Sequence, residues 1–267
     1  MTMWPDWERN FEIARAALDW QVEMGVDEAI CDAPINRYDL PGRVERAARP
    51  VAIPPAGASG QPATADPVAA ARAAAGVATS LAALRDELAA YPHCELRQGA
   101  RNLVFSDGQE GARVMIVGEA PGREEDLQGK PFVGEAGQLL DRMFAAIAMG
   151  RAHPDPRRAL YITNILPWRP PQNRDPSPGE RAMMRPFVLR HIELAAPDIL
   201  LLMGRIPAMT LLETSEGITR IRGQWREVGG RPALPMFHPA YLLRNPAAKR
   251  EAWADLLELQ ARLRELT

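Results

Sequence analysis

The chain has 267 residues, a hydrophobic content of 46% and a formal net charge of −2. That composition supports a packed core, and no window offers the roughly 18 uninterrupted apolar residues of a membrane-spanning helix. Two cysteines in a chain of this length argue against a disulfide scaffold, and they favour a reducing compartment, for which we expect the cytoplasm. The opening sequence MTMWPDWERN lacks the basic-then-apolar pattern of a signal peptide.

The charge is unevenly distributed along the chain. Residues 1–36 hold eight acids and two arginines, so they carry −6, which leaves +4 for the remainder from the total of −2. Of the 32 cationic residues, all but Lys130 and Lys249 are arginine. Arginine suits phosphate oxygens, although a GC-rich genome would produce the same bias. The mildly basic body is therefore compatible with nucleic-acid binding but does not establish it.

The first ninety residues are expected to form an N-terminal extension, residues 1–90. Apolar residues at helical spacing predict an amphipathic helix over 5–24. The tract PVAIPPAGASGQPATADP at 50–67 has the composition of a linker. A second helix is predicted at about 68–90.

From residue 102 the pattern changes to short apolar strands that alternate with helices. The predicted strands are 113–117, 160–165, 198–203 and 234–237. Helices are predicted at 136–149, after the capping box formed by Ser177 and Glu180, near 206–213, and after Asn245. This alternation predicts a three-layer α/β/α sandwich around a mainly parallel, four-stranded sheet, within a domain that spans 91–267.

Three polar loops follow predicted strands and should converge. One is the glycine- and carboxylate-rich loop after Val117, the second begins at Asn164 and contains PWRPPQNR, and the third begins at His238. In open parallel sheets, ligands bind beyond the carboxyl ends of the strands, so we expect one crevice there. Taken singly, each feature has an ordinary explanation: a plain turn, a strand-end cap for Asn164, or a contact of Phe132 with the core.

Together the loops are far more specific. The segments GEAPGREEDLQGKPFVGEAGQLLDRM, YITNILPWRPPQNRDPSPGE and FHPAYLLRNPAAKREAWADLL resemble, in that order and spacing, the uracil-DNA glycosylase superfamily. They are most similar to its family 4, which is usually built around an iron–sulfur cluster. The resemblance covers about 94–257. It implies a monofunctional enzyme of base-excision repair that flips uracil out of single- or double-stranded DNA and hydrolyses its N-glycosidic bond.

This chemistry needs a recognition surface for the base and stabilisation of the departing anion. Phe132 would supply an aromatic face, and Asn164 would pair with N3–H and O4 of uracil, a pattern that cytosine reverses. A neutral His238 would donate to O2 as negative charge develops there. The backbone from Gly118 through Glu119 to Ala120 would contribute further amides.

A carboxylate is needed to position the attacking water. Four acids lie in the first loop: Glu119, Glu124, Glu125 and Asp126. The resemblance favours Glu119, with Glu125 second, and spacing does not separate them.

The same resemblance indicates where DNA would be contacted. Leu242 or Leu243 would fill the gap that the flipped base leaves, beside Tyr241. Arg244, together with Arg169 and Arg174, would contact phosphates.

The sequence departs from family 4 at the positions of the cluster ligands. By the motif alignment, these positions hold Tyr91, Cys94, Trp168 and Met184. A four-iron cluster takes four thiolates, so we expect no metal and no other cofactor, with side-chain packing in place of the cluster. The loop WRPPQNRDPSP has no basic insertion and no histidine, so covalent trapping of the sugar is not expected.

Two other functions remain open from the sequence. One is non-catalytic binding of uracil or abasic DNA, and the other is glycosylase activity on another base such as hypoxanthine. Intact Asn164, His238 and the carboxylate loop argue against the binder. A monomer without membrane association is the expected state.

Overall fold

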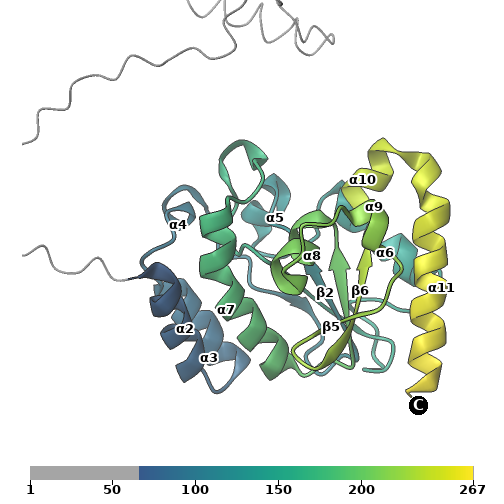
Figure 1. Ribbon diagram of the computed structural model, residues 1–267, viewed down its shortest axis with the longest axis horizontal. Coiled ribbons are helices and arrows are strands. Elements are labelled where there is room, and N and C mark those ends of the chain that lie inside the picture. The colour runs from purple at the N-terminus through teal and green to yellow at the C-terminus, as the bar shows by residue number, and fades with distance from the viewer. Residues whose placement is uncertain (1–65, 267) are drawn as a thin grey trace, which may run out of the picture. The chain divides into compact units, whose positions relative to one another are not determined.

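The computed structural model describes residues 66–266 (Figure 1). The helix predicted over 5–24 and the tract from 50 to 65 lie outside the described residues. No helix among the described residues is both long and apolar enough to cross a lipid bilayer.

The centre of the described part is a mixed sheet of six strands in the order β1-β3-β2-β4-β6-β5. The strands are β1 (Asp107–Gly108), β2 (Val114–Gly118), β3 (Leu160–Asn164), β4 (Ile199–Met203), β5 (Arg226–Val228) and β6 (Arg231–Met236). β3, β2, β4 and β6 are parallel neighbours, whereas β1 and β5 pair antiparallel at the two edges. The four predicted strands are thus confirmed, but the predicted strand count was too low, because two- and three-residue edge strands are too short to show an apolar pattern.

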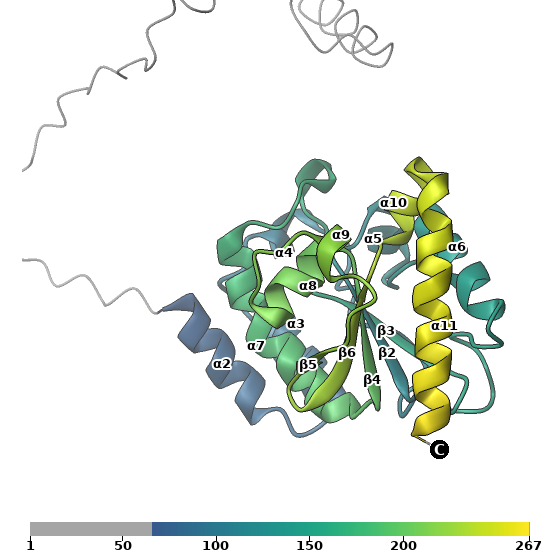
Figure 2. The ribbon, with the colours of Figure 1, turned by 45° about the vertical axis from the view of Figure 1, so that its right-hand side comes forward.

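Helices cover both faces of this sheet, as the α/β/α prediction required (Figures 1 and 2). One layer contains α2 (Pro67–Val77), α3 (Leu81–Ala90), α7 (Pro178–Ala195) and α8 (Arg205–Leu212), and the other contains α6 (Glu135–Ala145) and α11 (Lys249–Glu265). The shorter helices are α4 (Leu96–Gly99), α5 (Arg123–Gln128), η2 (Pro171–Asn173), α9 (Ile218–Ile221), α10 (Pro239–Arg244) and η3 (Pro246–Ala248).

Alternate residues of each strand enter two separate cores. Met115 and Val117 of β2 pack with α2, α3 and α7, whereas Val114 and Ile116 pack with α6 and α11. The strands are buried on both faces, which explains why they appear in the sequence as continuous apolar runs rather than as alternating ones.

Helix boundaries differ from the predicted ones where the backbone turns. The predicted helix at 68–90 is two helices, because Ala78 is extended and the hydroxyl of Ser80 accepts a hydrogen bond from the Ala83 amide, 3.1 Å away, to begin α3. The helix predicted to 149 ends at Ala145, and Ala148 has a positive φ of 57°. The capping box of α7 forms as predicted.

The C-terminal helix begins later than predicted. Asn245 caps only the short turn η3, without a capping hydrogen bond from its side chain, and α11 starts at Lys249. The side-chain amide of Asn245 instead donates to the Tyr241 carbonyl oxygen over 3.3 Å.

The segment 66–90, predicted as part of an N-terminal extension, shares the core of the sheet. α2 and α3 both contact α7, and Ala71, Ala75, Leu84 and Leu88 are buried in the same cluster as Met115 and Val117. The core is therefore continuous across residue 90. Without α2 and α3, the apolar face of α7 that they cover would be exposed to solvent.

Leu84→Ala tests whether α3 is part of the cooperative fold. The Leu84 side chain is fully buried, so its truncation should lower the free energy of unfolding by about 2–5 kcal/mol, measured by urea denaturation. Val77→Ala is the matched control, because Val77 is 66% exposed and should change stability by less than about 0.5 kcal/mol. An unchanged unfolding midpoint in Leu84→Ala would show that α3 is an accessory element.

Candidate active site

The carboxyl ends of the parallel strands surround one cavity of about 430 Å³. The loops after β2, β3 and β6 all contribute to it, which is the convergence expected from strand order. Its lining includes Glu119, Ala120, Glu125, Phe132, Asn164, Arg174, His238, Tyr241 and Arg244.

His238 caps the first turn of α10. Its Nδ1 accepts a hydrogen bond from the Ala240 amide over 3.1 Å, so the neutral ring carries its proton on Nε2. Burial, assisted by the charge of Arg244, lowers the pKa of His238 to about 4. At neutral pH the side chain is therefore an uncharged hydrogen-bond donor.

Phe132 stacks on His238, with ring centroids 5.3 Å apart and an interplanar angle of 27°. Its ring is buried, and its backbone has a positive φ of 54°, which is rare for a bulky residue. A Cβ atom on Gly118 would lie 2.5 Å from the Phe132 ring and 2.3 Å from Oδ1 of Asn164. Only glycine at 118 allows the ring and the amide to approach each other so closely.

Asn164 is the last residue of β3 and is buried at the cavity. The pairing of β2 with β3 continues past the strands, since Ile165 N–H donates to the Gly118 carbonyl and Leu166 N–H to that of Glu119. Within residues 66–266 the Asn164 side-chain amide makes no hydrogen bond. Both its donor and its acceptor are thus available to a ligand.

Glu119 is the carboxylate best placed for chemistry. It lines the cavity, and burial, reinforced by the negative charge of Asp175, raises its pKa to about 7 despite the opposing charge of Arg205. A carboxyl with such a pKa exchanges protons near neutral pH, as a general base does.

Two of the other acids of this loop, Glu125 and Asp126, bind backbone amides. Both oxygens of Glu125 accept backbone hydrogen bonds, Oε2 from Gly122 and Oε1 from Val133 and Gly134. Asp126 accepts from the Arg101 and Asn102 amides. Glu124 is exposed and outside the cavity lining. Glu125, predicted as the second choice of catalytic carboxylate, is therefore occupied in holding the loop.

The residues predicted to contact DNA divide by exposure. Leu242 is 1% exposed and packs in a core cluster, which does not fit the role of a wedge, whereas Leu243 is 38% exposed. Tyr241 and Arg244 line the cavity mouth.

The two remaining arginines, in the loop after β3, are both paired with other residues. Arg174 makes a fork to Glu180, 2.6 and 2.9 Å long, and lowers the pKa of that carboxyl to about 2. Arg169 donates to Asn173 over 2.7 Å. A phosphate would have to compete with these partners.

Sequence reasoning missed the loop after β4. Gly204 has a positive φ of 100°, and a Cβ atom there would lie 3.1 Å from the His238 Cβ. Arg205 follows, and it pairs with Asp175 at 3.1 Å. β4 is also a parallel strand, so the rule that drew attention to the other three strand ends applied equally to this one.

The four positions that correspond to cluster ligands do not fit an iron–sulfur cluster. Tyr91, Cys94, Trp168 and Met184 are all buried in the core cluster that contains α2, α3 and α7, and Tyr91 makes an edge contact with Phe187. Cys94 supplies one thiol, and burial raises its pKa, which disfavours the thiolate that binds metal. Among the described residues, no group of three or more potential ligands is close enough to hold a metal ion.

Comparison with known proteins gives a consistent family. Residues 105–257 match the model of the uracil DNA glycosylase superfamily. A type-4 uracil-DNA glycosylase of Archaeoglobus fulgidus is 35% identical over 181 residues, 65% of this chain and 88% of that protein. Proteins of the same name from Thermotoga maritima and Saccharolobus solfataricus are 38% and 35% identical, over 57% and 67% of this chain and 77% and 85% of their own lengths.

We predict that the purified protein binds no stoichiometric iron. The packed apolar side chains leave one buried thiol where a four-iron cluster takes four. Metal analysis and the visible spectrum of aerobically and anaerobically purified protein would check this. About four irons per chain, or an absorbance near 400 nm that dithionite bleaches, would contradict it.

Proposed function

The chain belongs to the uracil DNA glycosylase superfamily and is a DNA glycosylase, and from that premise we propose that it hydrolyses the N-glycosidic bond of uracil in DNA. The product is an abasic site, the first intermediate of base-excision repair. The observation that carries the proposal is the cavity where the free amide of Asn164, the ring of Phe132, a neutral His238 and the carboxyl of Glu119 meet.

Recognition rests on the pairing pattern of the base. A uracil ring that has left the duplex stacks on Phe132. The Oδ1 of Asn164 accepts from N3–H, and its Nδ2 donates to O4. Cytosine presents the reverse pattern, and since Asn164 is buried, its unpaired donor and acceptor would make cytosine unfavourable.

Cleavage breaks the bond between N1 of uracil and C1′ of deoxyribose, with the electron pair leaving on the base. The Nε2–H of His238 donates to O2, where the negative charge accumulates. Glu119 orients a water molecule toward the cationic sugar and takes its proton as the new C1′–O bond forms. The leaving uracil anion is protonated by solvent after departure.

The surroundings of the cavity suggest how DNA is held. Tyr241 and Arg244 line the cavity, and Leu243, between them in the chain, is 38% exposed, so we assign Leu243 to the gap left by the flipped base. The proposed substrate is single- or double-stranded DNA, and the proposed state is a cytoplasmic monomer that does not bind membranes.

The first test separates catalysis from binding. Uracil-containing single strands should acquire alkali-labile sites with wild-type protein, and His238→Ala should slow single-turnover cleavage by roughly 10²–10³-fold with little change in DNA affinity. A protein that binds the strands without cutting them would be the non-catalytic binder. A well-folded His238→Ala that cleaves within about threefold of wild type would remove the histidine from the mechanism.

His238→Asn is the matched control for capping. Asparagine can accept the Ala240 N–H as an N-cap but is too short to donate from the position of Nε2. We expect His238→Asn to melt at about the wild-type temperature but to cleave as slowly as His238→Ala. Recovery of the wild-type rate would show that His238 acts only by capping α10.

The second test is the pH dependence of kcat/KM, which reports ionisations of the free enzyme. Because Glu119 must be ionised and its pKa is about 7, the value should rise with pH and level off above about 7. His238, with a pKa of about 4, stays neutral and adds no inflection between pH 5 and 8. Glu119→Gln should be slow and pH-independent in this range, whereas the same inflection in that variant would assign it elsewhere.

Asp175→Asn provides a directional check on the same group. Removal of this negative charge also frees its partner Arg205, and both changes favour the ionised form of Glu119. The inflection should therefore move to lower pH, and a shift upward would contradict the assignment.

A further inference from the structure

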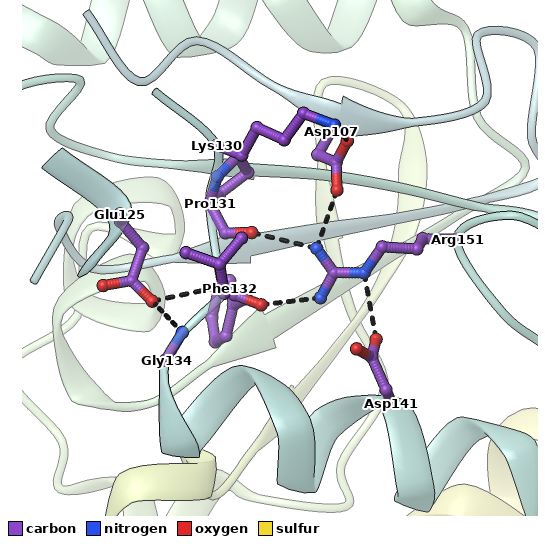
Figure 3. Close-up of polar contacts among 9 residues, drawn as sticks. Asp107, Glu125, Lys130, Pro131, Phe132, Gly134, Asp141 and Arg151 are labelled. Atoms are coloured by element: carbon purple, nitrogen blue, oxygen red, sulfur yellow. Dashed lines mark hydrogen bonds and ion pairs between the residues drawn. The ribbon is translucent and has the colours of Figure 1, made fainter. Parts of the chain in front are cut away.

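The backbone of Phe132 is held from outside the cavity by a single guanidinium. Arg151 follows the isolated bridge between Gly150 and Ala159 and is not among the residues that line the cavity. Its NH2 group donates to the Phe132 carbonyl over 2.7 Å, and its NH1 group donates to the Pro131 carbonyl over 3.0 Å. Figure 3 shows both carbonyls directed at the guanidinium.

Two carboxylates fix that guanidinium in turn. Its NH1 donates to Asp107 of β1 over 2.8 Å, and its Nε donates to Asp141 of α6 over 3.0 Å (Figure 3). The Arg151 side chain is 17% exposed. A mostly buried charged group with four hydrogen bonds has a defined orientation, because loss of a partner would leave a donor that water solvates poorly.

A second group, the carboxylate of Glu125, holds the backbone amides that follow Phe132. Oε1 of Glu125 accepts from both Val133 and Gly134, at 2.9 Å each. Helix α6 also approaches this peptide so closely that a Cβ on Gly137 would lie 1.8 Å from the Phe132 carbonyl oxygen. The left-handed peptide of Phe132 is thus enclosed by Arg151, Glu125 and Gly137.

We propose that Arg151 is a positioning residue for the base: by binding the Pro131 and Phe132 carbonyls, it keeps Phe132 left-handed and its ring against His238. The proposal rests on the proposed function, since it concerns how the stacking surface for uracil is held. Without the guanidinium, the loop would relax toward the ordinary negative φ of a bulky residue, which moves the ring out of register with the Asn164 amide.

A double-mutant cycle tests the coupling between Arg151 and Phe132. Arg151→Met keeps the aliphatic stem but loses all four hydrogen bonds, and it should slow single-turnover uracil excision at least tenfold. In a Phe132→Ala background the same substitution should change the rate by less than threefold, because no ring remains to be positioned. Equal effects in the two backgrounds would overturn the proposal.

Arg190→Met is the matched control. Arg190 likewise donates to a backbone carbonyl, that of Ala78, and pairs with Glu193, but it does not line the cavity. Its loss should leave the excision rate within twofold of wild type. If it slows excision as much as Arg151→Met does, the effect of Arg151 is general stability, and the proposal is wrong.

A readout independent of activity separates this inference from the proposed function. Hydrogen exchange of the peptide that covers 130–135 should become faster in Arg151→Met, with that of α7 unchanged. Arg151→Lys can bind one carbonyl but cannot bind both at once, so it should be intermediate in both exchange and rate. It replaces Arg151→Met in the double-mutant cycle if Arg151→Met unfolds at the assay temperature. If exchange at 130–135 is the same in Arg151→Met and wild type, Arg151 does not hold the Phe132 peptide and this inference is wrong. If exchange differs as expected but the wild-type protein never excises uracil, only the proposed function is wrong.

Discussion

The parallel pairing of β3, β2, β4 and β6 is the constraint on which the site depends. It brings the carboxyl ends of these strands to one edge, so residues far apart in the chain line the same cavity. Close approach of the loops then requires residues without side chains. Gly118 lies between Phe132 and Asn164, and Gly204 lies against His238. The apolar strands therefore supply the scaffold, and the two glycines supply the clearance.

The same desolvated environment shifts the two titrating groups in opposite directions. Burial raises the pKa of Glu119 and lowers that of His238, since it disfavours the charged form of either group. A neutral donor and a carboxylate that ionises near neutral pH are the two groups that the proposed departure of an anionic base would use. The ring of Phe132, the proposed stacking surface, is held in place because hydrogen bonds bind both the Phe132 carbonyl and the amides that follow it.

Much of this organisation was predictable from sequence, and the failures have physical causes. The buried strands and the capping box of Ser177 depend on local patterns, so they were found. The edge strands β1 and β5 have too few residues for a pattern. The break at Ala78 depends on tertiary contact, because Arg190 holds its carbonyl. Glu125 could not be separated from Glu119 by spacing, since only the folded loop reveals that its oxygens are bound to backbone amides.

The choice between Leu242 and Leu243 has the same origin. On a helix of one or two turns, such as α10, adjacent leucines point about 100° apart, and which one is buried depends on what the helix rests upon. Arg151 left no sequence signal at all, because its partners at 107, 131, 132 and 141 meet it only in the folded chain.

At the centre of the proposed function, the buried Asn164 amide distinguishes uracil from cytosine. The most direct measurement is release of free base from single strands that carry uracil, cytosine, hypoxanthine or thymine at one defined position. Uracil should be released while cytosine stays intact, because cytosine would leave the Asn164 donor and acceptor facing like groups. Release of cytosine as fast as uracil, or no release of uracil, would rule this out, whereas hypoxanthine and thymine present the same N–H and C=O edge as uracil and so test the shape of the cavity rather than the amide.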